Sequence, residues 1–141
     1  PDRLFGPDSP SGDKRSMVNP APRPQSHAVV LVVDDEDLVR RLMARTLTDA
    51  GYRVVEARSG AEAVAVLSSE AGGIHLVASD IAMPRMTGVE LAGVVTERWP
   101  TIPLLLVSGQ GRPPDDYRGS FLPKPFTPDS LVAAAISLLQ A

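Results

Sequence analysis

The sequence predicts a doubly wound α/β domain, in which helices cover both faces of a central parallel β-sheet. Two observations support this fold class. From residue 28 onward, short apolar runs rich in β-branched residues alternate with segments whose apolar residues have helical spacing. Polar residues follow directly after several of these runs. Repeated βα units of this kind form parallel sheets with right-handed crossover connections.

Length and composition fit one small domain with an extension. The 141 residues are 43% hydrophobic but only 4% aromatic, so we expect an aliphatic core. A net charge of −3 does not indicate binding to nucleic acid or to an anionic membrane surface, and neither is expected as a partner. The absence of cysteine excludes disulfides and thiolate chemistry. Neither a membrane helix nor a signal peptide is visible, so we expect a cytoplasmic protein.

Residues 1–27 differ from the rest of the chain. Proline, serine and isolated charges occur there without apolar periodicity, so this segment cannot bury enough surface to offset its ordering entropy. We expect a disordered Pro/Ser-rich tail or linker over 1–27 and one folded domain over 28–141. The chain begins with Pro1 rather than Met, which suits a fragment or a processed product.

The first strand and helix are predicted over 28–33 and 37–50. The strand is a continuous β-branched run, which is typical of a strand buried on both faces. Gly51 follows the helix at a position where glycine commonly ends helices.

The apolar face of this first helix is expected to consist of residues at helical spacing, which are Leu38, Val39, Leu42, Met43, Thr46 and Leu47. Three arginines of the same helix are expected to form one solvated basic stripe. They are Arg40, Arg41 and Arg45.

The middle of the chain repeats the alternation. A short strand is predicted over 53–57, and Ser59 is expected to cap the helix that follows. A third strand over 74–79 ends directly before Asp80. The next helix, over 87–99, is ended by Pro100.

The last elements are two strands and a helix. The fourth strand is predicted over 102–107, and 120–122 can form a brief fifth strand. Thr127 is expected to be the N-cap of the final helix, with Pro128 at its first position, where proline is favourable.

Polar residues follow four of the five predicted strands. Asp34 and Asp35 follow the first strand, Asp80 the third and Ser108 the fourth, and Lys124 lies just past the fifth. Because active crevices of open parallel sheets lie at the carboxyl ends of the strands, these side chains are expected to meet at one edge.

Three neighbouring carboxylates repel one another, and a hard divalent cation such as Mg²⁺ would relieve that repulsion. A carboxylate can also be a nucleophile toward phosphorus and form an aspartyl phosphate. The equatorial oxygens of a transferring phosphoryl group can be neutralised jointly by Mg²⁺ and a lysine. The sequence therefore predicts a magnesium-dependent phosphoryl-transfer site.

These residues lie in motifs that resemble the response-regulator receiver family of two-component signalling. The resemblance runs from about Val29 to Leu139. The motifs are Val32-Val33-Asp34-Asp35, Ser79-Asp80-Ile81-Ala82-Met83-Pro84, Thr87-Gly88-Val89-Glu90-Leu91, Val107-Ser108-Gly109 and Phe121-Leu122-Pro123-Lys124-Pro125-Phe126.

The resemblance implies a flavodoxin-like fold with a five-stranded sheet in the order 2-1-3-4-5. It implies that Asp80 accepts the phosphoryl group from a histidine kinase or phosphotransfer protein. Asp35 would bind Mg²⁺ directly, Asp34 directly or through water, and the backbone carbonyl of Ala82 would be a further ligand. A downstream protein target would then respond to the phosphorylated state.

The same resemblance implies roles for three residues beyond the metal ligands and one cis peptide bond. Ser108 and Lys124 would contact the bound phosphoryl group, and Phe121 would turn inward when Ser108 moves. The bond between Lys124 and Pro125 is expected to be cis, a state that is common only before proline.

The segment between Ser108 and Lys124 departs from the family. Only 15 residues separate them, and these include three glycines and a Pro-Pro pair. A loop, a helix of three turns and a strand need roughly 20 residues. We therefore expect the fourth helix to be shortened or absent, with at most two turns over 114–118, and the chain to be a monomer.

Three readings of the function remain open at this stage. The chain could be a stand-alone receiver, the receiver of a hybrid sensor kinase, or a Mg²⁺-dependent phosphohydrolase with an aspartyl nucleophile. The last reading is disfavoured because such hydrolases carry a second acid two residues after the nucleophile, where this chain has Ala82. Enzymatic activity beyond the chain's own phosphorylation and dephosphorylation is expected only if it is part of a hybrid kinase.

Overall fold

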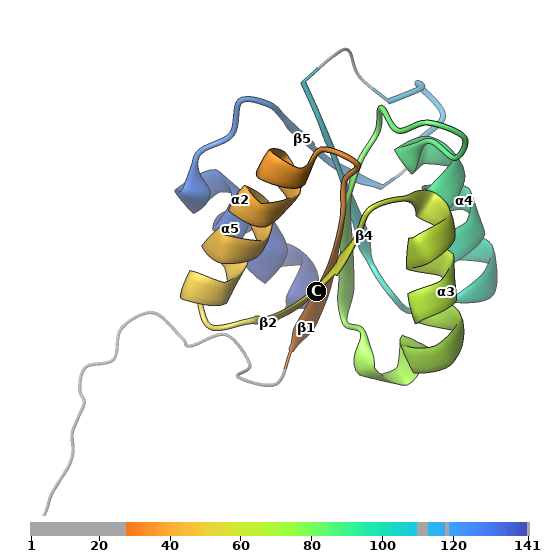
Figure 1. Ribbon diagram of the computed structural model, residues 1–141, viewed down its shortest axis with the longest axis horizontal. Helices are drawn as coiled ribbons and strands as arrows, with labels where there is room; N and C mark the ends of the chain where they lie inside the picture. The colour runs from red at the N-terminus through yellow and green to blue at the C-terminus, as the bar shows by residue number, and fades with distance from the viewer. Residues whose placement is uncertain (1–27, 110–112, 118, 141) are drawn as a thin grey trace, which may run out of the picture.

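A computed structural model describes residues 28–109, 113–117 and 119–140. Within them, five parallel strands form one sheet in the order β2-β1-β3-β4-β5, as the family resemblance implied (Figure 1). The tail predicted over 1–27 lies outside the described residues. The strands are β1 (Val29–Val33), β2 (Arg53–Ala57), β3 (Leu76–Asp80), β4 (Leu104–Ser108) and β5 (Ser120–Pro123).

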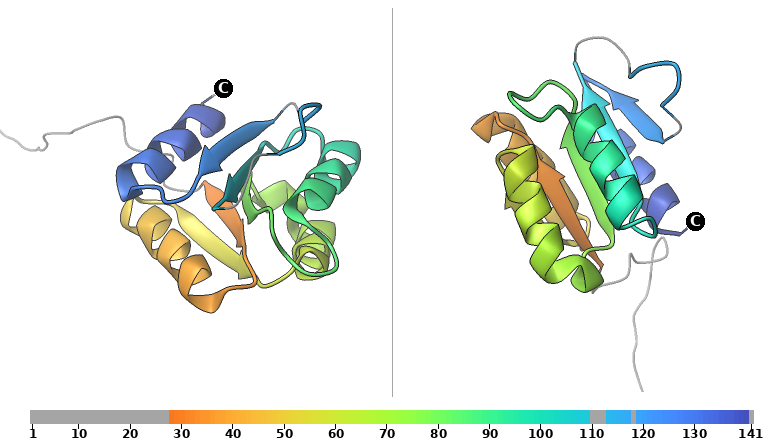
Figure 2. Two further views of the ribbon diagram at one scale, coloured as in Figure 1. Left: turned by 90° about the horizontal axis from the view of Figure 1, so that it is seen from above. Right: turned by 90° about the vertical axis from the view of Figure 1, so that its right-hand side faces the viewer.

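Helices cover both faces of this sheet. Helices α2 and α5 pack side by side on one face, and α3 and α4 pack on the other (Figures 1 and 2). The doubly wound α/β prediction is therefore confirmed. The helices are α2 (Asp37–Asp49), α3 (Gly60–Glu70), α4 (Gly88–Arg98) and α5 (Pro128–Leu139), with a short 3₁₀ turn, η2 (Ala71–Gly73), after α3.

The core forms two aliphatic layers, one on each face of the sheet. Successive side chains of a strand point to opposite faces, so Val30 and Val32 of β1 pack toward α2 and α5. Leu31 and Val33 pack toward α3 and α4 instead. All four are fully buried, which confirms that β1 is buried on both faces.

The helix caps predicted at Ser59 and Thr127 are present, and Thr87 caps α4 in the same way although it was not predicted to do so. The side chains of Ser59, Thr87 and Thr127 each accept a hydrogen bond from a backbone N–H in the first turn of the following helix. Pro128 is the first residue of α5, a position whose N–H would have no partner within the helix, so the missing N–H of proline costs no hydrogen bond there.

The connection from β4 to β5 contains no helix among its described residues. Tyr117 N–H donates to the carbonyl of Pro114, which closes a single turn. The Tyr117 hydroxyl donates to the carbonyl of Ser120 at 2.7 Å and holds this turn against the start of β5. The prediction of a shortened or absent fourth helix is confirmed for these residues, while 110–112 and 118 lie outside the described part.

Two expectations for α2 are wrong. Leu38 and Leu42 are 82% and 56% exposed, although they were expected to face the core. Arg40, expected in a solvated stripe, is only 3% exposed. The helix is rotated so that Met43, Ala44 and Leu47 face the sheet, and this rotation also turns Arg40 inward.

None of the described helices is both long and apolar enough to cross a membrane.

Candidate functional site

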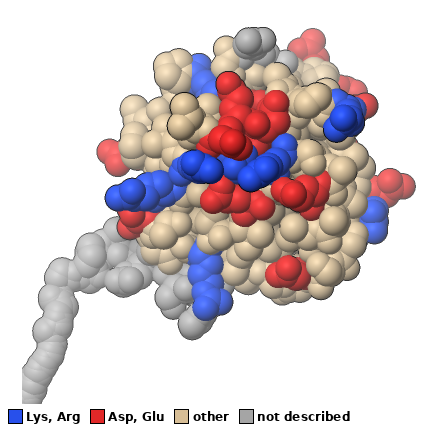
Figure 3. Space-filling view, viewed as in Figure 1, with Lys and Arg blue, Asp and Glu red and all other residues tan. Residues whose placement is uncertain are grey.

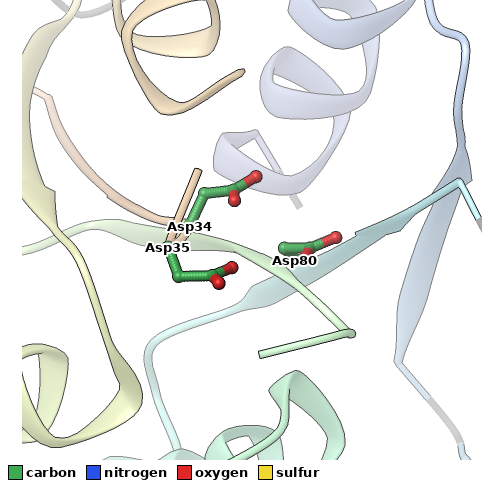
Figure 4. A group of neighbouring side chains, drawn as sticks. All are labelled: Asp34, Asp35 and Asp80. Carbon is green, nitrogen blue, oxygen red and sulfur yellow. The ribbon is translucent and has the colours of Figure 1, made fainter. Parts of the chain in front are cut away.

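The site lies at the carboxyl edge of the sheet, where β1 and β3 end side by side. β3 ends with Asp80, and Asp34 and Asp35 directly follow the last residue of β1. The parallel register pairs Val33 with Ser79, so the first residue after β1 and the last residue of β3 lie next to each other. Figure 4 shows the three carboxylates gathered there, as the sequence predicted.

The three acids are close enough to share one small cation. One carboxylate oxygen from each of Asp34, Asp35 and Asp80 lies within 4.8 Å of the other two. Asp34 and Asp80 are buried, whereas Asp35 is exposed and leaves the cluster open to solvent on its side. Carboxylate oxygens are the ligands that Mg²⁺ prefers, and it usually retains several waters, which this open side can admit.

Lys124 lies between the two buried acids. Its Nζ is 3.2 Å from Asp80 Oδ1 and 3.5 Å from Asp34 Oδ2. The contact with Asp80 is a hydrogen bond, but the contact with Asp34 is an ion pair only. Asp34 Oδ2 is buried without a hydrogen-bond donor, so this oxygen has capacity left for a cation. The residues present therefore fit Mg²⁺.

Burial dominates the electrostatics of the two inner acids. It raises the pKa of Asp34, against the backbone hydrogen bond from Glu36, and the charge of Asp80 raises it further. Burial also raises the pKa of Asp80, where Lys124 lowers it and the charge of Asp35 raises it. When folding raises the pKa of a carboxyl group, the stability of the protein falls as the pH rises above the pKa of that group in the unfolded chain. The whole loss of stability is present once the pH exceeds the pKa of the group in the folded protein. A bound cation would offset this loss at neutral pH.

The backbone around Asp80 is held from both sides. Ile81 N–H donates to the carbonyl of Val107 at 3.1 Å, and Gly88 N–H donates to the carbonyl of Ile81 at 2.8 Å. Gly88 is also the first residue of α4, and a Cβ there would overlap the carbonyl oxygen of Asp80. The start of α4 is therefore packed directly on the backbone of the predicted phosphoryl acceptor.

The structure also places the remaining residues that were predicted for the site, which are Ser108, Phe121 and Ala82, and the bond before Pro125. Ser108 ends β4 and is buried, and its carbonyl accepts the Lys124 N–H at 2.7 Å. The predicted cis bond before Pro125 is present. Phe121 is partly buried in β5, on the edge strand of the sheet, and Ala82 is exposed in the loop after β3. The roles given to Phe121 and to the Ala82 carbonyl stay predictions.

Arg40 also contacts this site, through the backbone carbonyl of Asp34, although only a solvated side chain was expected at this position. Hydrogen bonding from Arg40 lowers the pKa of Asp37. Burial lowers the pKa of Arg40, but the hydrogen bonds and charges of Glu56 and Asp37 outweigh this effect, so the pKa of Arg40 is raised. Figure 3 looks onto the β2 edge of the sheet and shows acidic side chains on both sides of a basic band. The one available signal was the position of Arg40, one turn into the helix that follows the acidic pair.

Known proteins resemble this chain along most of its length. The response regulator receiver domain family matches residues 30–136. The sensor kinase CckA of Brucella abortus is 35% identical over 94% of this chain, which covers 15% of that kinase. The C4-dicarboxylate transport transcriptional regulatory protein DctD of Rhizobium meliloti is 40% identical over 77% of this chain, which covers 24% of that regulator.

A solved structure agrees in fold and length. The crystal structure of the receiver domain from the hybrid histidine kinase CckA is 35% identical and has a TM-score of 0.71. The match covers 80% of this chain and 100% of that domain. By contrast, the chain spans only a small part of full-length CckA and DctD.

Proposed function

The chain belongs to the response regulator receiver domain family of two-component signalling, and we propose that it accepts a phosphoryl group onto Asp80 and thereby controls a partner protein. The observation that carries this proposal is the shared contact of Lys124 Nζ with Asp80 and Asp34, within a cluster of three carboxylates. A buried carboxylate beside a lysine and a cation site is arranged for attack on phosphorus.

The proposed reaction is transfer of a phosphoryl group from a phosphohistidine to Asp80. A carboxylate oxygen of Asp80 attacks the phosphorus of a phosphohistidine, the new O–P bond forms as the N–P bond breaks, and the imidazole nitrogen keeps the electron pair. Mg²⁺, held by Asp34, Asp35 and Asp80, would supply positive charge to the phosphoryl oxygens. Lys124 is placed to form an ion pair with the transferred group, because its Nζ already contacts the accepting carboxylate. Ser108, at the end of the adjacent strand β4, is proposed to donate a hydrogen bond to it.

The phosphoryl donor is proposed to be a histidine kinase or a phosphotransfer protein that docks on α2. This helix starts one residue after the acidic pair, and it exposes Leu38 and Leu42. Beside them, a groove of about 660 Å³ runs between α2 and α5 and is lined by Leu42, Val132 and Ile136 among others. A donor that buries these leucines would bring its histidine next to Asp80. Because such kinases use cytoplasmic ATP, the proposal places the chain in the cytoplasm.

Membership of a larger hybrid kinase is a second candidate for the context of this chain. Its support is the similarity to the sensor kinase CckA over 94% of the chain. In either context the reaction at Asp80 is the same. The two differ in whether the phosphoryl donor is part of the same protein.

The experiment that tests the function is labelling of Asp80. Incubation with Mg²⁺ and acetyl phosphate should place one phosphoryl group on each chain, as a mass increase that is lost at alkaline pH. We expect Asp80→Asn to abolish the label, because the amide cannot act as the nucleophile. Asp49→Asn, at the far end of α2, should label like the wild type. A label that persists in Asp80→Asn would show that another residue is the acceptor.

A further inference from the structure

Arg40 is the one arginine or lysine with a buried side chain among the described residues. It lies in the first turns of α2, and only 3% of its side chain is exposed. Arginine is almost never this deeply buried unless it is paired. Its two carboxylate partners, Asp37 and Glu56, are 56% and 41% exposed, so the guanidinium is buried while its partners remain in contact with solvent.

The guanidinium of Arg40 contacts three parts of the chain. Its NH1 group donates to the backbone carbonyl of Asp34 at 3.1 Å and is 2.9 Å from the carboxylate of Asp37. Its Nε donates to Glu56 at 2.9 Å. Glu56 belongs to β2, whereas Asp34 and Asp37 flank the start of α2. Arg40 therefore ties the turn after β1 to the neighbouring strand.

These contacts restrain the residues of the proposed metal site. The carbonyl of Asp34 is held by Arg40, and its Oδ1 accepts the Glu36 N–H at 2.9 Å. With these two points fixed, Oδ2 of Asp34 is directed toward Lys124, at 3.5 Å. Asp35 is the next residue, so the direction in which its side chain leaves the turn depends on the same peptide plane.

We propose that Arg40 is a positioning residue for the Mg²⁺ and phosphoryl site, a role that rests on the proposed function. Arg40 holds the acidic turn in the geometry in which three carboxylates meet, and it does so through the Asp34 carbonyl rather than by touching the reacting atoms. The planar guanidinium is required because its N–H groups point in fixed directions toward separate acceptors. A lysine at this position keeps the positive charge but cannot donate in these fixed directions to the separate acceptors.

The test compares Arg40→Lys with Arg45→Lys. Arg45 lies on the same helix and pairs with Asp49 at 3.3 Å, but its side chain is 77% exposed, so it controls for the loss of an arginine ion pair in α2. Mg²⁺ affinity is measured by calorimetry on the unphosphorylated chain, and the folded state is checked by circular dichroism. We expect Arg40→Lys to raise the Kd for Mg²⁺ by roughly tenfold, as is typical when a residue that hydrogen-bonds to a metal ligand is replaced. Arg45→Lys should leave the Kd within about twofold of the wild-type value.

A purely structural role would change stability and leave the affinity alone. Leu47→Val, a core substitution in the same helix, should lower the melting temperature without weakening Mg²⁺ binding. If folded Arg40→Lys binds Mg²⁺ as the wild type does, the positioning role is wrong. Should Arg40→Lys fail to fold, Glu56→Ala removes the acceptor of the Arg40 Nε–H on β2, and unchanged Mg²⁺ affinity in that variant overturns the inference equally.

The outcome separates this inference from the proposed function. A wild-type chain that neither binds Mg²⁺ nor becomes labelled at Asp80 would contradict the proposed function itself. A wild-type chain that does both, beside an Arg40→Lys variant of equal Mg²⁺ affinity, would contradict only the role of Arg40.

Discussion

At the scale of single residues, the site is a balance between three negative charges and one positive charge. Lys124 offsets part of the repulsion, yet the pKa values of Asp34 and Asp80 remain raised because both acids are buried. Asp35 is exposed, and its charge contributes to the raised pKa of Asp80. The arrangement is therefore less stable at neutral pH without a cation than it would be with one carboxylate neutralised.

The prediction at this scale concerns Asp35→Asn. Without Mg²⁺ we expect this variant to be at least as stable as the wild type, with a gain of up to about 1 kcal/mol, because one repulsive charge is removed. With Mg²⁺ its melting temperature should hardly rise, since a ligand of the cation is lost. Thermal unfolding with and without 10 mM Mg²⁺ (roughly the excess that saturates a millimolar site) measures both effects.

Asp49→Asn is the matched control, because Asp49 is an exposed acid of α2 that pairs only with Arg45 in the described contacts. It should keep the full Mg²⁺-induced shift. A shift of wild-type size in Asp35→Asn would remove Asp35 from the list of metal ligands.

At the scale of elements, the start of α4 and the end of β3 form one packed unit. Thr87 and Glu90 form a capping box that defines where α4 begins, and Gly88 then lies against the Asp80 carbonyl. Because this contact is between backbone atoms, no side-chain rearrangement can make room for a Cβ. The position of the acceptor therefore depends on the helix that follows it.

Gly88→Ala should expose this dependence. We expect a loss of about 1–3 kcal/mol in the free energy of unfolding, as is typical of overpacking, together with slower labelling of Asp80. Gly93→Ala is the control within the same helix, because nothing lies within 4 Å of the Cβ it would add. That variant should gain up to about 1 kcal/mol from helix propensity and label normally. Denaturant unfolding and the labelling assay measure both; equal stability of the two variants would contradict the packing argument.

At the scale of the whole molecule, the face made by α4, β4 and the turn before β5 contains a groove. This groove of about 580 Å³ lies where a longer connection would place a helix, and its lining includes Val89, Ala92, Thr96, Leu104 and Tyr117. The Tyr117 hydroxyl is already bonded to Ser120 within the chain, and burial raises its pKa to about 12. The described residues of this face, which leave out 110–112 and 118, offer no projecting apolar helix to a second copy.

We therefore predict that phosphorylation does not drive dimerisation through this face. Sedimentation of the 15.0 kDa chain with and without beryllofluoride, a stable phosphoryl mimic, should show a monomer in both states. Tyr117→Ala should leave the sedimentation coefficient unchanged. An activated dimer at micromolar concentration that Tyr117→Ala dissociates would show that this surface is an interface after all.

The sequence by itself determined the order of elements and the residues at the carboxyl edge of the sheet. Apolar runs of β-branched residues specify strands, caps such as Ser59 and Thr127 specify helix starts, and parallel strands bring their carboxyl ends together. Asp34, Asp35 and Asp80 could be placed in one cluster for that reason. The number of residues between Ser108 and Lys124, with their prolines and glycines, predicted the lack of a long helix that the described part of this connection shows.

Only the tertiary structure decided how α2 is rotated and what its residues contact. Helical spacing allowed Leu38 and Leu42 to face the core as readily as Met43 and Leu47, because adjacent stripes of one helix were both apolar. Packing against the sheet and α5 selected the second stripe and carried Arg40 inward. Its partner Glu56 lies 16 residues away, on strand β2, and no local sequence pattern relates a helix residue to a strand residue at that separation. Long-range contacts of this kind depend on the sheet register, which forms only when the strands pair.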